Sequence, residues 1–238
     1  APQAMLAQIT LPRMTDALQG ATLDECLRAA NAVATEAGAA LVGGHTSMGA
    51  ETSIGFTVTG LLDQPALTLV GAQAGDLVVL SRKIGSGTLL AGEMRGLANG
   101  DDIAACLARM ATLDLEGAAR LARHATAMTD VTGFGLLGHA ARLADASDIT
   151  MEIDAEKVPL YQGAEALAQA GVRSTIYDAN RRAVPVDIPD AGRAALLFDP
   201  QTSGGLLATV PAAVVDQLGD VTVIGRCIAK SATPIVIS

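Results

Sequence analysis

The chain has 238 residues, of which 50% are hydrophobic, 17% are charged and 2% are aromatic. This length allows one large domain or two small ones, and the apolar fraction excludes intrinsic disorder. Charged residues, glycine or proline interrupt every apolar run before 18 residues, so no membrane-spanning protein is expected. The net charge of −9 argues against nucleic-acid partners. It leaves open a nucleotide bound through main-chain amides and a bridging cation.

Three cysteines, Cys26, Cys106 and Cys227, lie far apart and form no CxxC motif. They predict neither a zinc site nor a disulfide framework, and they fit the reducing cytosol. No signal peptide is recognisable, so we expect a cytoplasmic protein. The first residues read as the interior of a domain, so we expect an amino-terminal segment to precede Ala1.

The beginning of the chain predicts a strand followed by a helix. Residues 5–12 read as a strand that ends at a proline. Thr22 and Glu25 form the capping-box pattern of a helix, and Gly38 is a stop signal for it. One apolar stripe recurs at the helical period in this segment, made of Leu23, Leu27, Ala30, Ala34 and Ala37.

Two more strands complete this region. A buried strand over 39–42 runs into the turn Gly43-Gly44-His45-Thr46. The two glycines either let the main chain approach an anion and offer amide donors, or serve only a tight turn. Strand 53–62 places the large apolar side chains on one face, namely Ile54, Phe56, Val58 and Leu62, opposite Thr57 and Thr59. Such an edge strand would suit subunit pairing.

A break rich in Gly, Pro and Asp over 63–76 predicts a boundary between a domain over 1–65 and a domain over 66–238. The second domain is expected to contain, in chain order, strand 76–81, helices within 86–124, a strand, loop and helix over 126–145, strand 149–154, helix 161–170, an irregular stretch to 199, strand 205–210, a helix from Pro211 to Gly219, and strands 221–225 and 234–238.

The densest polar segment in an apolar setting is MTDVTGFG, residues 128–135. The Asp130 carboxylate, at a strand-to-helix junction, suits Mg²⁺, and the amides of the following helix suit phosphate. Alternatively, Asp130 or Thr132 only caps that helix. The same stretch spells GxGxxG, but several elements precede it. Its candidate acidic residues, Glu152 and Asp154, lie 14 and 16 positions after its last glycine, which we read as too early for a dinucleotide-binding fold.

A second polar segment, DPQTSGG over 199–205, precedes an apolar strand. It reads either as a plain loop with Asx and Ser/Thr turns or as a loop that lines a ligand. His124 reads as a partner for a helix C-terminus, and His139 as a packed or surface helix residue. We interpret all three cysteines as inert.

Three segments together resemble one family: GGHT with the strand that follows it, MTDVTGFGLLGH, and DPQTSGGLL. They are similar to the selenophosphate synthetases (selenide, water dikinases) of the aminoimidazole ribonucleotide synthetase superfamily. The resemblance implies an α/β (α+β) fold of two domains with mixed sheets, the amino-terminal one incomplete here. It also implies an enzyme that uses ATP and Mg²⁺ to make selenophosphate from selenide, releasing AMP and phosphate, with a monovalent cation as a further candidate cofactor.

The resemblance also assigns roles to residues. Asp130 corresponds to a metal-binding aspartate, and Gly43, Gly44, His45 and Thr46 correspond to a loop that contacts nucleotide. In the family this loop comes from the partner subunit of a homodimer, in which the amino-terminal domains pair.

The chain departs from the family pattern in several places. The Gly-rich segment with a reactive cysteine or selenocysteine and a lysine does not occur, nor do two further metal-binding aspartates. Ser47-Met48-Gly49 stand where an aspartate often follows the histidine, and 173–182 looks closer to variants fused to a flavin-type oxidoreductase. We therefore expect the chain to carry only part of the active site and to be inactive alone. The alternatives are a non-catalytic nucleotide-binding or dimerisation module of a larger protein, and another ATP-dependent enzyme of the superfamily.

Overall fold

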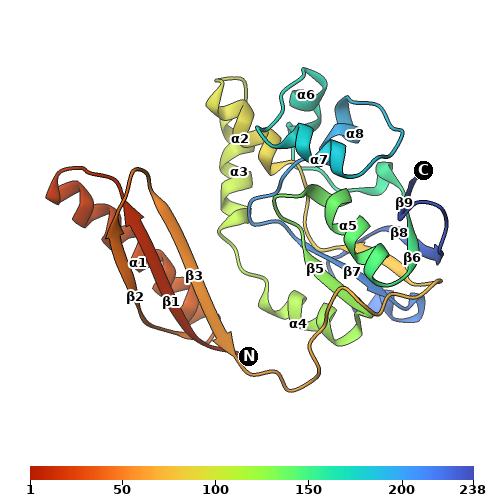
Figure 1. Ribbon diagram of the computed structural model, residues 1–238, viewed down its shortest axis with the longest axis horizontal. Helices are drawn as coiled ribbons and strands as arrows, with labels where there is room; N and C mark the ends of the chain where they lie inside the picture. Colours follow the sequence, from red (N-terminus) through yellow and green to blue (C-terminus); the bar gives the residue numbers. More distant parts are fainter. The chain divides into compact units, whose positions relative to one another are not determined.

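The computed structural model describes residues 1–238, which divide into two compact units, Ala1–Ala66 and Leu67–Ser238. Each unit has its own sheet and its own hydrophobic core (Figure 1). Both sheets contain parallel and antiparallel pairs, which confirms the predicted α/β class with mixed sheets. None of the helices combines the length and apolar character needed to cross a bilayer.

Unit 1 is a three-stranded sheet with one helix. Its elements are β1 (Pro2–Leu11), α1 (Asp16–Glu36), β2 (Ala40–Met48) and β3 (Ser53–Gly60), and the strand order is β2-β1-β3. β1 is parallel to β2 and antiparallel to β3. Alternate residues of β1 are buried, namely Met5, Ala7, Ile9 and Leu11. Met5 packs with Ala30 and Ala34 of α1, two members of the predicted apolar stripe.

The predicted start of α1 is wrong. The N-cap is Thr15, whose Oγ1 accepts a hydrogen bond from the main-chain N–H of Leu18. Thr22 lies inside the helix and donates its hydroxyl proton to the carbonyl oxygen of Leu18. Gly38, with φ of 75°, follows the C-cap as predicted, because its backbone is left-handed.

The predicted turn at Gly43–Thr46 is also wrong, because these residues belong to β2. Gly44 lies opposite Ala7 of β1, and Thr46 lies opposite Ile9. A Cβ at position 44 would collide with the carbonyl oxygen of Ala7, so this glycine allows the two backbones to approach. The segment is therefore extended strand rather than a nest of amides around an anion.

Unit 2 contains a six-stranded sheet in the order β5-β7-β4-β8-β6-β9, in which only β6 and β9 are parallel neighbours. The strands are β4 (Leu77–Leu80), β5 (Ala127–Asp130), β6 (Ile149–Ile153), β7 (Leu206–Val210), β8 (Thr222–Ala229) and β9 (Ile235–Ile237). The helices are α2 (Ser86–Met94), α3 (Gly100–Met110), α4 (Leu115–His124), α5 (Gly135–Ala146), α6 (Ala164–Gln169), α7 (Tyr177–Ala183) and α8 (Gly192–Leu196), with short 3₁₀ helices η1 (Ala155–Lys157) and η2 (Ala212–Gln217).

Helices cover both faces of this sheet (Figure 1), and the side chains of β4 alternate between the two faces. Val78 and Leu80 point into the larger core, which they share with α2, α3, α5, α6, α7 and α8. Val79 points to the other face and packs with Leu121 of α4. β5 is an edge strand antiparallel to β7, so the GxGxxG match does not open a doubly wound parallel sheet.

Two other predictions for unit 2 need correction. The stretch expected to be irregular before residue 199 contains α7 and α8, whose 7 and 5 residues are too few to show a helical period. Arg173 and Tyr177 both hydrogen-bond to Asp190, which closes the loop between them. Pro211 precedes a 3₁₀ helix rather than starting an α-helix.

Candidate functional site

Asp130 lies where three strands of unit 2 begin or end. β4 and β5 are both antiparallel to β7, so their carboxyl ends lie beside the start of β7, at the same end of the strands. Asp130 is the last residue of β5 and is exposed. Its carboxylate takes part in none of the hydrogen bonds or ion pairs of the structure, so both oxygens remain available to a ligand.

Neither Asp130 nor Thr132 caps the following helix. The N-cap of α5 is Phe134, which makes no capping side-chain bond. The N–H of Thr132 donates instead to Nε2 of His139 at 3.0 Å. The His139 ring is therefore the neutral tautomer with its proton on Nδ1, and burial lowers the pKa of this ring. His139 fixes the loop after Asp130, and its Nε2 is not free for a metal.

The loop 131–135 is held by residues far away in the sequence. The N–H of Val131 donates to the carbonyl oxygen of Gly205 at 2.8 Å, and the N–H of Gln201 donates to that of Thr132 at 3.0 Å. Asn180 of α7 is buried and donates from Nδ2 to the carbonyl oxygens of Gly133 and Phe198, at 2.8 and 3.0 Å. Asp130 thus precedes a rigid junction. No local sequence pattern points to Asn180, because its partners are carbonyl groups far away along the chain.

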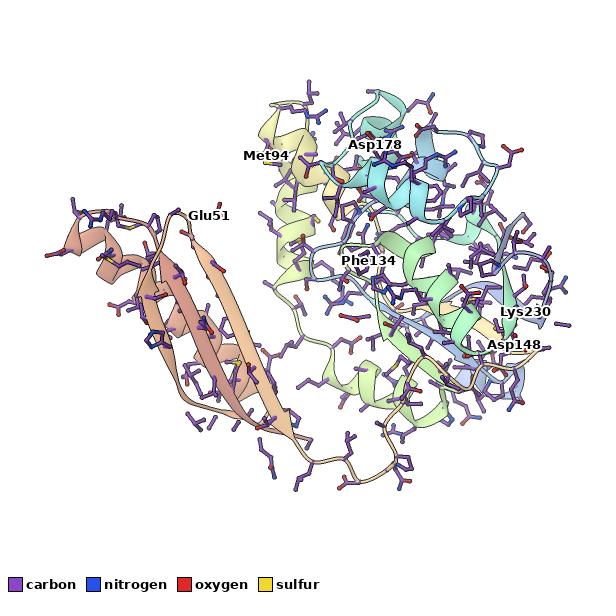
Figure 2. All side chains as sticks on the ribbon, in the orientation of Figure 1. Glu51, Met94, Phe134, Asp148, Asp178 and Lys230 are labelled. Atoms are coloured by element: carbon purple, nitrogen blue, oxygen red, sulfur yellow. The ribbon has the colours of Figure 1, made fainter.

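Two of the amides that the glycines at the N-terminus of α5 were expected to offer to phosphate are used within the protein. The N–H of Gly135 already donates to Thr132, and that of Leu137 donates to Leu197, both at 3.1 Å. Gly135 has φ of 71°, and a Cβ there would lie 2.7 Å from the carbonyl group of Phe198. Figure 2 shows Phe134 at the start of α5, where its side chain remains 58% exposed.

The segment 199–205 serves mainly to hold the first turn of α2. Oδ1 of Asp199 accepts from the hydroxyl of Thr88 at 2.8 Å. Oε1 of Gln201 accepts from the amides of Gly85 and Ser86 at 3.0 and 3.1 Å. Asp199 and Gln201 are both buried, which favours the structural interpretation of this loop. Only Thr202 and Ser203 are exposed.

Two glycines let the same segment pack between neighbouring strands. A Cβ at Gly204 would collide with the carbonyl oxygen of Val131, and a Cβ at Gly205 would lie 2.7 Å from the amide nitrogen of Arg82. This loop therefore packs against the residues that directly follow β4 and β5.

The residues present supply only part of a metal site. The chain contains no group of three or more His, Cys, Asp or Glu side chains able to hold a metal ion. Asp130 gives one carboxylate, which fits Mg²⁺ only when water and phosphate oxygens provide the other ligands. Cys106 and Cys227 are buried, and burial raises the pKa of both thiols, that of Cys227 to about 12. Both thiols therefore remain protonated and inert, as predicted.

In unit 1, the four residues assigned to nucleotide contact lie on an edge strand. Gly43, Gly44, His45 and Thr46 line a shallow cleft of about 430 Å³ on β2. His45 also borders a second cleft of about 430 Å³ that reaches Phe56 of β3. All four residues are exposed, so they are accessible to a ligand.

The family model for the C-terminal domain of AIR synthase related proteins matches residues 73–234. The chain belongs to this family. Among curated relatives, it is 33% identical over 230 residues to selenide, water dikinase 2 of Peptoclostridium acidaminophilum, covering 90% of the chain and 66% of the relative. It is 37% identical over 188 residues to the selenide, water dikinase of Geobacter metallireducens, covering 76% and 55%. These relatives confirm the family resemblance, although the chain spans less than two thirds of their length.

Solved structures share the fold at low sequence identity. Thiamine-monophosphate kinase from Aquifex aeolicus matches with a TM-score of 0.73 and 20% identity, covering 100% of this chain and 73% of that one. The hydrogenase maturation protein HypE in complex with ATP matches with a TM-score of 0.73 and 16% identity, covering 99% and 70%. The fold of this family member is therefore that of the AIR synthase-like proteins.

Asp199 gives a prediction on the pH dependence of stability. Burial raises its pKa from 3.8 to about 6, so the folded state binds this proton more tightly than the unfolded state does. The free energy of unfolding should therefore fall by up to about 3 kcal/mol, relative to Asp199→Asn, as the pH rises from about 4 to about 6. Urea unfolding followed by tyrosine fluorescence measures this, because both tyrosines lie in unit 2 and the chain has no tryptophan. Identical pH profiles for the two proteins would contradict the assignment.

Proposed function

We propose that this chain is part of an ATP-dependent phosphotransferase of the selenide, water dikinase type, which makes selenophosphate from selenide. The names of the curated relatives support this class of reaction. The observation that carries the proposal is the exposed Asp130 carboxylate, which makes no bond within the protein and precedes a junction fixed by three distant residues.

In this proposal Asp130 holds Mg²⁺ together with phosphate oxygens of the nucleotide. The ion would neutralise charge on the phosphates and orient them. Thr132 and His139 keep the loop after Asp130 in one conformation through their hydrogen bond. One carboxylate cannot organise a triphosphate for transfer alone, so this chain would provide one part of the catalytic site.

Nucleotide contact is proposed for Gly43, Gly44, His45 and Thr46 of β2. Their exposure on an edge strand beside two clefts supports this role. Two structures with the same fold are complexes with ATP or its analogue AMPPCP, namely HypE and AaThiL. Because the backbone of β1 fills the space next to Gly44, His45 and Thr46 would provide the main contacts through their hydrogen-bonding side chains.

The metal assignment predicts the behaviour of Asp130→Asn. We expect this substitution to weaken Mg²⁺-dependent binding of ATP by the chain at least tenfold, because a charged ligand to the ion is lost. Binding of ATP in EDTA should not change. Isothermal titration calorimetry with and without Mg²⁺ measures both quantities.

Asp216→Asn is the matched control, because Asp216 is another exposed carboxylate of unit 2. Equal Mg²⁺-dependent affinities for Asp130→Asn and the unsubstituted chain would rule out Asp130 as the ligand.

We also propose a homodimer formed through unit 1. A groove of about 550 Å³ separates α1 from β3 and is lined by Ile54, Phe56 and Val58. These three side chains are 45–56% exposed. Such a patch on an edge strand is unfavourable in water, and a second copy of the chain would cover it.

Phe56→Asp tests this interface. We expect the substitution to shift the chain from dimer to monomer in sedimentation velocity at micromolar concentration, because it places a charge in the apolar groove. Thr57→Asp, a neighbour on the opposite face of β3, should leave the dimer intact. A monomeric unsubstituted chain, or equal effects of both substitutions, would contradict the proposed interface.

A second candidate function is nucleotide binding without catalysis, as a module of a larger protein. The absence of a complete metal cluster in the chain favours it. Measuring AMP formation from ATP by the full-length protein that contains this chain separates the candidates. Selenide-dependent AMP supports the dikinase, phosphate transfer to another acceptor supports a different enzyme of the superfamily, and binding without turnover supports the module.

A further inference from the structure

A polar cleft opens at the same end of the unit 2 strands as Asp130. It has a volume of about 330 Å³ and lies beside the end of β4, the start of β8 and one face of α3. Three cationic and two acidic side chains line it, together with a tyrosine; they are Arg82, Lys83, Arg109, Asp102, Asp220 and Tyr161. We call this the Arg109 pocket. Its excess of cations contrasts with the net charge of −9 of the chain.

Arg82 is fixed in place by main-chain carbonyl groups rather than by acids. Its Nη2 donates to Thr112 at 2.6 Å, and its Nη1 donates to Arg109 and Ser203 at 3.4 and 3.3 Å. Burial and the nearby Arg109 guanidinium lower the pKa of Arg82. No carboxylate lies within ion-pair distance of Arg82, so its charge faces the pocket without a counter-ion.

Arg109 makes no hydrogen bond or ion pair through its side chain, although it is only partly exposed. Placing it near Arg82 costs electrostatic energy, because both guanidiniums remain charged. The Tyr161 hydroxyl experiences the field of both arginines, while burial raises the pKa of this phenol. The Tyr161 hydroxyl therefore stays protonated, and it can donate a hydrogen bond to an anion. Lys83 adds an exposed ammonium group that has no ion-pair partner.

The acidic groups do not neutralise this end of the pocket. Asp102 lies seven residues before Arg109 on α3, about 10 Å along the helix axis, and its carboxylate packs against Gly163. Asp220 is exposed at the rim. Asp114, outside the lining, partly offsets the effect of Arg109 on Arg82. Neither lining carboxylate forms an ion pair with the arginines.

We propose that the Arg109 pocket binds the phosphate group of a small anionic ligand, independently of Asp130. A guanidinium, an ammonium and a phenol hydroxyl approach from α3, from the loop after β4 and from the segment before α6, which suits a tetrahedral oxyanion with several acceptors. The volume is at the lower end for ligand sites, so it fits a phosphate or a small phosphate ester. Because nothing in this argument involves Asp130, it stands apart from the proposed function.

Inorganic phosphate is the probe for the test, with glycerol 3-phosphate as an ester and acetate as a carboxylate. Binding to the 238-residue chain is measured by calorimetry in EDTA, which silences cation-dependent binding at Asp130. We expect phosphate to bind at least tenfold more weakly to Arg109→Gln and threefold or more weakly to Tyr161→Phe. Tighter binding of the ester than of phosphate would identify an ester as the ligand class, and the reverse order would identify phosphate itself.

Arg226→Gln is the control, because Arg226 is an exposed arginine of the same unit that pairs with Glu152. It should leave phosphate affinity unchanged within twofold. If Arg109→Gln fails to fold, the phosphate affinity of Lys83→Gln tests the pocket instead, because Lys83 is exposed and makes no ion pair. The proposal is overturned if the unsubstituted chain does not bind phosphate, if Arg109→Gln and Lys83→Gln bind it normally, or if acetate binds as tightly.

Discussion

The structure of unit 2 depends on the close contact between the segments 131–135 and 198–205. Both segments cross the sheet edge, and their backbones meet at Gly135 and Gly204, where a Cβ would collide with main-chain atoms. Hydrogen bonds between Val131 and Gly205, and between Gln201 and Thr132, close the contact. Because α2, α5, β5 and β7 all begin or end here, this contact sets the positions of the polar groups along the edge.

Polar residues around this contact divide into those that hold the fold and those that face solvent. Asp199, Gln201 and Asn180 are buried and bonded within the protein, so they are unsuited to direct ligand binding. Asp130 is exposed and unbonded. Ser203 links the contact to the Arg109 pocket, because its carbonyl oxygen accepts a hydrogen bond from Arg82. Its backbone is left-handed, with a φ of 50°. Such a conformation costs about 1–2 kcal/mol in a residue other than glycine, which the surrounding bonds must offset.

Local patterns predicted the elements that carry Asp130 but not the groups that hold them. The strand, loop and helix over 126–145 were predicted because an apolar strand, two glycines and a periodic helix adjoin each other. The strand at Gly43–Thr46 was missed, because paired glycines usually indicate a turn and only the opposing Ala7 reveals their purpose. The role of Asn180 depends on carbonyl groups 18 and 47 positions away, which no local pattern contains.

In the proposed function, a cation on Asp130 brings nucleotide to the end of the sheet in unit 2. Paramagnetic broadening by Mn²⁺ in the presence of ATP measures this directly, since the effect falls steeply with distance from the ion. We expect the amide signals of Thr129 to Gly133 to broaden first in ¹H–¹⁵N spectra, and Asp130→Asn to abolish that broadening. Preferential broadening at other acidic residues, with the 129–133 signals intact, would contradict the account.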